Sequence, residues 1–102
     1  MTLLDKLQAD LATAQKARDQ RQVDTLRFLL GAVFNLQIDK YPQGSRASLT
    51  DSDVLSVISK QIKTHRESIE MFNKAKRLDL VEREEGELAI LQSYLPAQEV
   101  AS

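Results

Sequence analysis

The chain has 102 residues and a formal net charge of −1, with 42% hydrophobic and 28% charged residues, a composition ordinary for one globular domain. It contains no cysteine, which excludes disulfides, thiolate metal sites and a thiol nucleophile. No apolar run approaches the roughly 20 residues that a membrane span requires, and the first residues have the features of neither a secretory signal nor a transit peptide. We therefore expect a cytoplasmic protein.

Charge is unevenly distributed along the chain. Residues 1–77 contain 13 Lys and Arg against 9 Asp and Glu, whereas residues 78–102 contain one basic residue against six acidic ones. The body is therefore mildly basic and the final segment is acidic.

Helical periodicity recurs four times, and the period-two alternation of strands is nearly absent. Thr2 and Asp5 fit a capping box that opens a first helix ending near Arg18. Its inward face contains Leu3, Leu7, Leu11 and Ala14. Asp19 and Gln22 form a weaker box that opens a second helix ending near Lys40. Its inward face contains Val23, Leu26, Leu30, Val33 and Phe34. No Gly or Pro separates the two helices, so they could be continuous, but the pattern favours a break near Asp19.

A loop is predicted at residues 41–48, "YPQGSRAS", which combine Pro, Gly and two serines. Thr50 and Asp53 then form a capping box, with a hydrophobic staple between Leu49 and Val54. They open a third helix that should end near Lys76. Its apolar stripe, with a period of about 3.6 residues, contains Val54, Ile58, Ile62, His65, Ile69 and Phe72.

A fourth capping box is predicted at Asp79 and Glu82, and its helix should end near Tyr94. The inward face contains Val81, Leu88, Leu91 and Leu95. Pro96 disfavours helical backbone at Leu95, so the helix should stop sharply there. Long helices without strands predict an all-α fold, a bundle of about four helices packed as antiparallel hairpins.

The pattern of possible catalytic residues indicates no intrinsic activity. His65 is the only histidine and lies on an apolar stripe, so a half-buried ring against leucines is favoured over a functional role. One histidine without a spaced Glu or second His is not a zinc signature. No Ser/His/Asp or Ser/Lys spacing is present, and the isolated glycines form no phosphate-binding loop. We therefore expect no catalytic residue, no metal and no cofactor.

A basic cluster in and just after the third helix is the better candidate site. It contains Lys60, Lys63, Arg66, Lys74, Lys76 and Arg77. Such a stripe attracts a phosphate backbone. Alternatively the face is merely solvated, with helical ion pairs such as Glu70 to Lys74, Lys63 to Glu67 and Arg66 to Glu70 lowering its field. Aromatic residues are not interleaved, so stacking on single strands is not indicated.

Two stretches together resemble one family. "DKLQADLATAQKARDQRQVDTLRFLLGAV" and "LTDSDVLSVISKQIKTHRESIEMFNKAKRLDLVEREEGELAILQSYLP" look like the amino-terminal region of the GatB/YqeY family, specifically the free-standing YqeY-like proteins. The likeness covers roughly residues 3 to 98. The most specific positions are Leu26, Arg27, Arg66, Phe72, Asp79, Leu80, Glu87, Leu88, Leu91, Tyr94, Leu95 and Pro96.

This resemblance implies an amino-terminal helical domain, here residues 1–95, followed by a small helical module. Residues 96–102 would then begin the linker to a module that this chain lacks. The related tail of the GatB subunit helps a tRNA-dependent amidotransferase hold tRNA, while the chemistry lies in other domains.

The first hypothesis is therefore a non-catalytic module that aids tRNA binding or amidotransferase-related translation through the basic cluster. The alternative is a protein-interaction scaffold without nucleic-acid binding, in which the acidic fourth helix and an apolar groove dock a protein, such as an amidotransferase subunit. Amide transfer by this chain itself follows only from the family name. A membrane partner is not expected.

Overall fold

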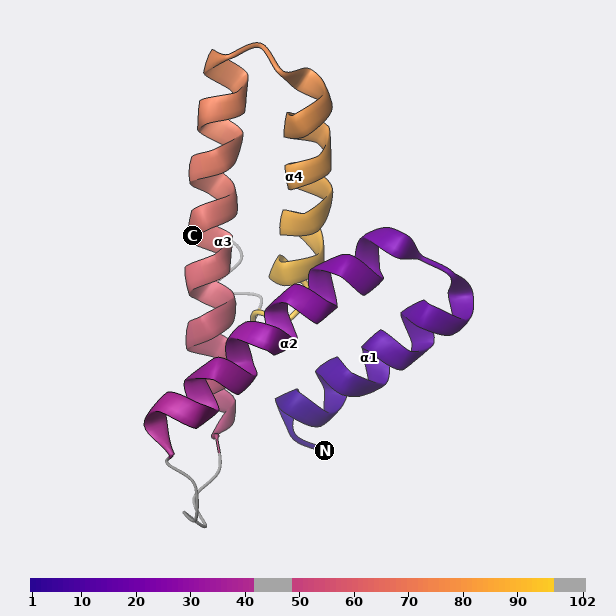
Figure 1. The fold of residues 1–102 in the computed structure, drawn as a ribbon, viewed down its shortest axis with the longest axis vertical. Helices are drawn as coiled ribbons and strands as arrows, with labels where there is room; N and C mark the ends of the chain where they lie inside the picture. The colour runs from indigo at the N-terminus through magenta and orange to yellow at the C-terminus, as the bar shows by residue number, and fades with distance from the viewer. Residues whose placement is uncertain (42–48, 97–102) are drawn as a thin grey trace. The chain divides into compact units, whose positions relative to one another are not determined.

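The computed structural model describes residues 1–41 and 49–96, and in these ranges it contains four helices and no strand. They are α1 (Leu3–Ala17), α2 (Gln20–Lys40), α3 (Asp51–Lys74) and α4 (Leu78–Gln92). Figure 1 shows α1 antiparallel to α2, and α3 antiparallel to α4. The predicted all-α fold with helical hairpins is confirmed. The predicted loop after Tyr41 and the predicted linker after Pro96 lie outside the described residues.

The chain divides into two compact units, Met1–Val57 and Ile58–Ser102, and the boundary falls inside α3. In the described ranges, no helix combines the length and the apolar character needed to cross a membrane.

In the first unit, local side-chain chemistry fixes where α1 and α2 begin and end. Thr2 accepts a hydrogen bond from the Asp5 amide, and Asp5 accepts one from the Thr2 amide, so the predicted capping box is confirmed. Arg18 adopts a left-handed conformation with φ 56°, and the Asp19 amide donates to the Ala14 carbonyl at 3.0 Å. This arrangement is a Schellman motif, and Arg18 occupies the left-handed position where glycine is usual. The Asp19 side chain then caps α2, which confirms the predicted break.

Most of the buried apolar residues of the first unit lie on the predicted stripes. The buried residues are Leu7, Ala14, Val23, Leu26, Leu29, Leu30, Val33 and Val54. Phe34 was predicted to point inward, but it is 41% exposed, whereas Leu29 is fully buried. At about 100° per residue, Phe34 lies roughly 90° from the centre of the buried stripe, which explains its position at the edge.

The start of α3 is held by a network of carboxylates. Asp53 accepts from the Thr50 amide at 2.9 Å, and the Asp53 amide donates to the Thr50 hydroxyl at 3.1 Å, as the predicted capping box requires. Lys40 donates to Asp53 at 2.6 Å, and this contact, together with the Thr50 amide, lowers the pKa of Asp53 to about 2. Asp51 accepts from the Leu3 amide at 2.9 Å, which connects the first residue of α1 to the first residue of α3.

In the second unit, α3 and α4 form a hairpin with a three-residue connection. Lys76 is left-handed with φ 57°, and the Arg77 amide donates to the Phe72 carbonyl at 2.9 Å, so α3 ends at Lys74, two residues before its predicted end. The predicted N-cap at Asp79 is wrong. Arg77 occupies that position without a side-chain cap, because the reversal at Lys76 already lets α4 begin at Leu78. Ile58, Ile62, Val81 and Leu91 are buried in this unit.

Candidate functional site

The six predicted cations all lie in the second unit and are all exposed. Lys60, Lys63, Arg66 and Lys74 project from α3, and Lys76 and Arg77 lie in its connection to α4. At about 100° per residue, the four cations of α3 fall within a sector of roughly 120°. The centre of this sector is about 140° from that of the apolar stripe, so the cations face away from the buried side. We call these six residues the basic face.

Ion pairs neutralise two of the six residues. Lys74 lies 3.5 Å from Glu70, which confirms the predicted pair. Arg77 contacts Asp79 at 3.2 Å and 3.3 Å through two nitrogens, and this guanidinium lowers the pKa of the Asp79 carboxyl below its usual range. The partners in both pairs are well exposed, so each contributes little to stability.

The other four cations of the basic face are free of such pairing. Within the described ranges, Lys60, Lys63, Arg66 and Lys76 form no ion pair, and the predicted Lys63–Glu67 and Arg66–Glu70 pairs are not formed. Glu67 and Glu70 lie in the same sector and reduce its charge without eliminating it. The basic face therefore keeps a net positive charge along one side of α3 and in the connection that follows it.

A second group of chemically competent side chains lies inside the same hairpin. The Nδ1 atom of His65 on α3 hydrogen-bonds to Glu84 on α4 and lies 3.8 Å from a Glu87 oxygen. One ligand atom from each of the three residues lies within 4.8 Å of the other two. All three side chains are half-buried, as predicted for His65. Arg83 approaches the other Glu87 oxygen at 3.7 Å.

Sequence reasoning identified His65 but missed its partners. The necessary signal is the register of the hairpin. His65 and Glu87 are equally far from Lys76 at the turn, and Glu84 lies one helical turn before Glu87. In an antiparallel hairpin, residues equally far from the turn face each other. Without the position of the turn, a histidine on one helix and two glutamates on the next give no recognisable spacing.

The residues singled out by the resemblance are mostly structural. Leu26 and Leu91 are fully buried. The half-buried positions are Phe72, Leu80, Leu88, Tyr94, Leu95 and Pro96. Arg27 is exposed on α2, while Asp79 and Glu87 form the ion pairs described above.

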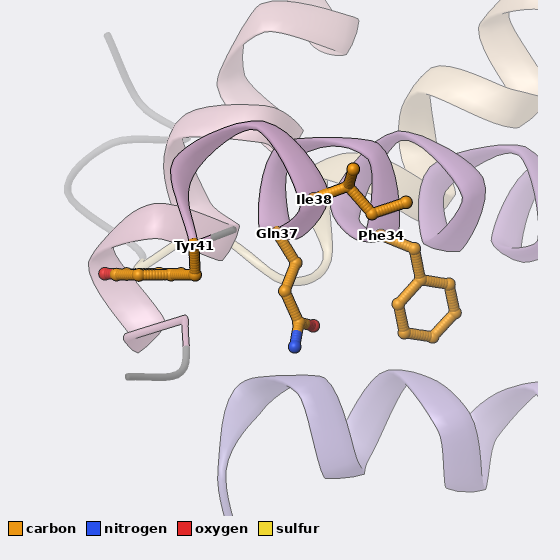
Figure 2. A pocket seen from close by; sticks show the side chains of 4 residues that line it. All are labelled: Phe34, Gln37, Ile38 and Tyr41. Atoms are coloured by element: carbon orange, nitrogen blue, oxygen red, sulfur yellow. The ribbon is translucent and has the colours of Figure 1, made fainter. Parts of the chain in front are cut away.

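An exposed apolar strip on α2 is a further surface feature. Phe28 is 72% exposed and Ile38 is 70% exposed, and Gly31 between them has no neighbouring atom within 4 Å of the position a Cβ would take. A groove at the end of the strip is lined by Phe34, Gln37, Ile38 and Tyr41. Figure 2 shows the side chains of Phe34 and Gln37 pointing from α2 toward α1. The groove has no clustered charges that would indicate catalysis.

Comparison with known proteins identifies one family. The family model of the Yqey-like protein matches residues 4–101. Several similar relatives bear the name Altered inheritance of mitochondria protein 41, mitochondrial. The protein of Pyrenophora tritici-repentis is 38% identical over 92 residues, which are 90% of this chain and 48% of the relative. That of Lachancea thermotolerans is 41% identical over 96 residues, 94% of this chain and 49% of the relative. That of Saccharomyces cerevisiae is 34% identical over 97 residues, 94% of this chain and 50% of the relative.

These relatives concern two properties of the chain, its cellular location and its length. The cytoplasmic location expected from the sequence is wrong, because the relatives are named as mitochondrial proteins. The chain also spans only about half the length of these curated relatives. The family model nonetheless covers nearly all of its residues, and the matches to the relatives extend over the same region. The chain belongs to the family of YqeY-like proteins.

Proposed function

We propose that this chain is a non-catalytic helical module that binds folded RNA of the tRNA type through the basic face of α3. The observation that carries the proposal is the row of Lys60, Lys63 and Arg66, which are exposed, unpaired within the described ranges and one turn apart on one helix. At 1.5 Å per residue, this row extends over about 9 Å of helix axis, enough to contact more than one phosphate of a backbone.

The chemistry of the basic face favours backbone contacts over base reading. It contains lysine and arginine without an interleaved aromatic residue on which an exposed base could stack. Double-stranded RNA is recognised largely through its shape, its phosphates and its 2′-hydroxyls, because its deep major groove is inaccessible to side chains. A short cationic helix face is suited to this mode of binding. In the family context, such contact would aid amidotransferase-related translation without any reaction on this chain.

The proposal predicts how steeply the affinity for RNA should fall with salt concentration. Each neutralised phosphate contributes about −0.7 to −0.9 to the slope of log K against log salt concentration. Four unpaired cations would therefore give a slope of roughly −3. If RNA bound to another surface, substitutions on α3 would leave this slope unchanged.

The test is a titration of the purified chain with tRNA at low and high salt, comparing Lys63→Glu with Lys16→Glu. Both variants reverse one exposed helical lysine and change the net charge equally, but Lys16 lies on α1 in the first unit. We expect Lys63→Glu to weaken binding and to reduce the salt slope by about 1 or more, while Lys16→Glu leaves both nearly unchanged. No binding at low salt, or equal effects of the two variants, would refute the proposal.

We also propose that the chain acts in mitochondria, on the strength of its relatives' names. Fractionation of cells that produce the protein should recover it with mitochondria. Recovery in the cytosolic fraction would contradict this location.

A second candidate function, an interaction scaffold without nucleic-acid binding, is favoured by the exposed strip on α2. Its apolar side chains and the open space over Gly31 suit the docking of an amphipathic helix from another protein. Ile38→Glu should then release a co-purifying partner, whereas Lys63→Glu should not. A strictly monomeric chain that retains no partner in sizing experiments would count against this candidate.

A further inference from the structure

We infer that His65, Glu84 and Glu87 form a zinc site within the α3–α4 hairpin. The three side chains come from two helices of one unit, and their ligand atoms already converge within 4.8 Å. Nδ1 of His65 contacts Glu84 and lies 3.8 Å from Glu87, so the imidazole is directed at both carboxylates. This inference does not depend on RNA binding, because the basic face lies on a different side of α3.

The donor set favours zinc over magnesium and calcium. One imidazole nitrogen and two carboxylate oxygens suit Zn²⁺, which accepts nitrogen and oxygen ligands and often has three protein ligands and one open position. Mg²⁺ and Ca²⁺ prefer oxygen ligands alone, so a histidine at the centre of the cluster disfavours them. The chain has no cysteine, so no thiolate could compete for the ion.

The required geometry is close to the observed one. Zinc bonds of about 2.0–2.2 Å in a tetrahedral arrangement place neighbouring ligand atoms roughly 3.3–3.6 Å apart. The distance between His65 and Glu87 is 3.8 Å, so only a few tenths of an ångström separate these atoms from binding positions. A zinc ion bound to Nδ1 of His65 and to the Glu84 carboxylate would take the place of the hydrogen bond between them.

Electrostatics also favours a cation in this place. The side chains of Glu84 and Glu87 are 20% and 16% exposed, so water screens their mutual repulsion only in part. Glu87 also contacts Arg83, which is 65% exposed and approaches the other oxygen of this carboxylate at 3.7 Å. A divalent ion between the carboxylates would neutralise both, and Arg83 would then orient Glu87 from outside the metal shell.

The experiment is a titration of the untagged chain with Zn²⁺, followed by calorimetry and by the NMR signals of the imidazole ring. His65 is the only histidine, so its ring signals report on the site without further assignment. The matched variants are Glu84→Gln and Glu85→Gln, which remove the same charge from adjacent positions of α4, the first half-buried and the second exposed. Circular dichroism of each variant should show unchanged helicity.

We expect one zinc ion per chain, a shift of the His65 ring signals, and affinity at least about tenfold lower in Glu84→Gln than in Glu85→Gln. Mg²⁺ should produce no comparable shift. If Zn²⁺ leaves the ring signals unchanged, or if the two variants bind it equally, the cluster is an ion pair only and the inference is overturned. RNA binding by Glu84→Gln should equal that of the unmodified chain, so the two proposals can fail independently.

Discussion

Replacing Lys76 by glycine should stabilise the protein, although it removes a charge from the candidate site. Lys76 adopts φ 57°, at the position of a Schellman motif that glycine usually occupies. A residue with a Cβ loses about 1–2 kcal/mol in this conformation. Glycine avoids that loss, but it adds about 0.4–1 kcal/mol of conformational entropy to the unfolded chain. The net gain in the free energy of unfolding is therefore about 0.5–1 kcal/mol.

Thermal unfolding followed by circular dichroism measures this gain. For a domain of this size, each 1 kcal/mol corresponds to about 4–8 °C, so Lys76→Gly should raise Tm by roughly 2–8 °C. Lys76→Ala is the matched control, because it removes the same charge and keeps the Cβ. Both variants should weaken RNA binding equally, whereas only the glycine variant should be more stable.

Arg18, which is left-handed in the first unit, allows the same glycine substitution to be tested a second time. Arg18→Gly has the same backbone geometry, with φ 56°, so its gain should add to that of Lys76→Gly. If neither glycine variant is more stable than its alanine counterpart, the left-handed conformations do not cost what their dihedral angles imply, and the reasoning is refuted.

Three further predictions concern stability. Leu26→Ala removes a fully buried side chain and should lower the free energy of unfolding by about 2–5 kcal/mol. Phe28→Ala changes a side chain that is 72% exposed and should alter the free energy from urea unfolding little, so equal effects of the two variants would contradict the observed core. Gly31→Ala meets no atom within 4 Å and should stabilise α2 by about 0.5–1 kcal/mol; a loss of thermal stability would instead indicate that another chain approaches this position. The hydrogen bond from Lys40 lowers the pKa of Asp53 to about 2. The contribution of the Asp53 carboxylate to the free energy of unfolding should therefore be complete above about pH 4 and be lost as the pH falls toward 2. A pH series of unfolding should show this loss, and Asp53→Asn should reduce it.

Much of the fold could be predicted because helices are determined by local chemistry. The capping boxes of Thr2 and Thr50 satisfy orphan amides only a few residues away, so their positions can be found without any tertiary information. The break near Asp19 was harder to place, because arginine at position 18 is not a usual left-handed residue. The same difficulty at Lys76 shifted the predicted end of α3 and the predicted cap of α4.

The candidate site could be predicted only in part. The positions of the lysines along α3 follow from helical geometry, but which of them remain unpaired depends on rotamers. Two of three equally spaced helical ion pairs expected on α3 did not form. Exposed pairs of this kind are weak, so spacing alone does not decide between them.

The sequence by itself determined that this chain is helical, where most helices begin, and which faces are apolar or basic, because these properties depend on residues within one or two turns of each other. Only the tertiary structure decided that His65 meets Glu84 and Glu87 and that Lys40 holds Asp53. These partners are separated by more than ten residues and lie on different helices, so they approach only when the helices pack in one register. Chemistry between distant residues requires that register, which no local pattern contains.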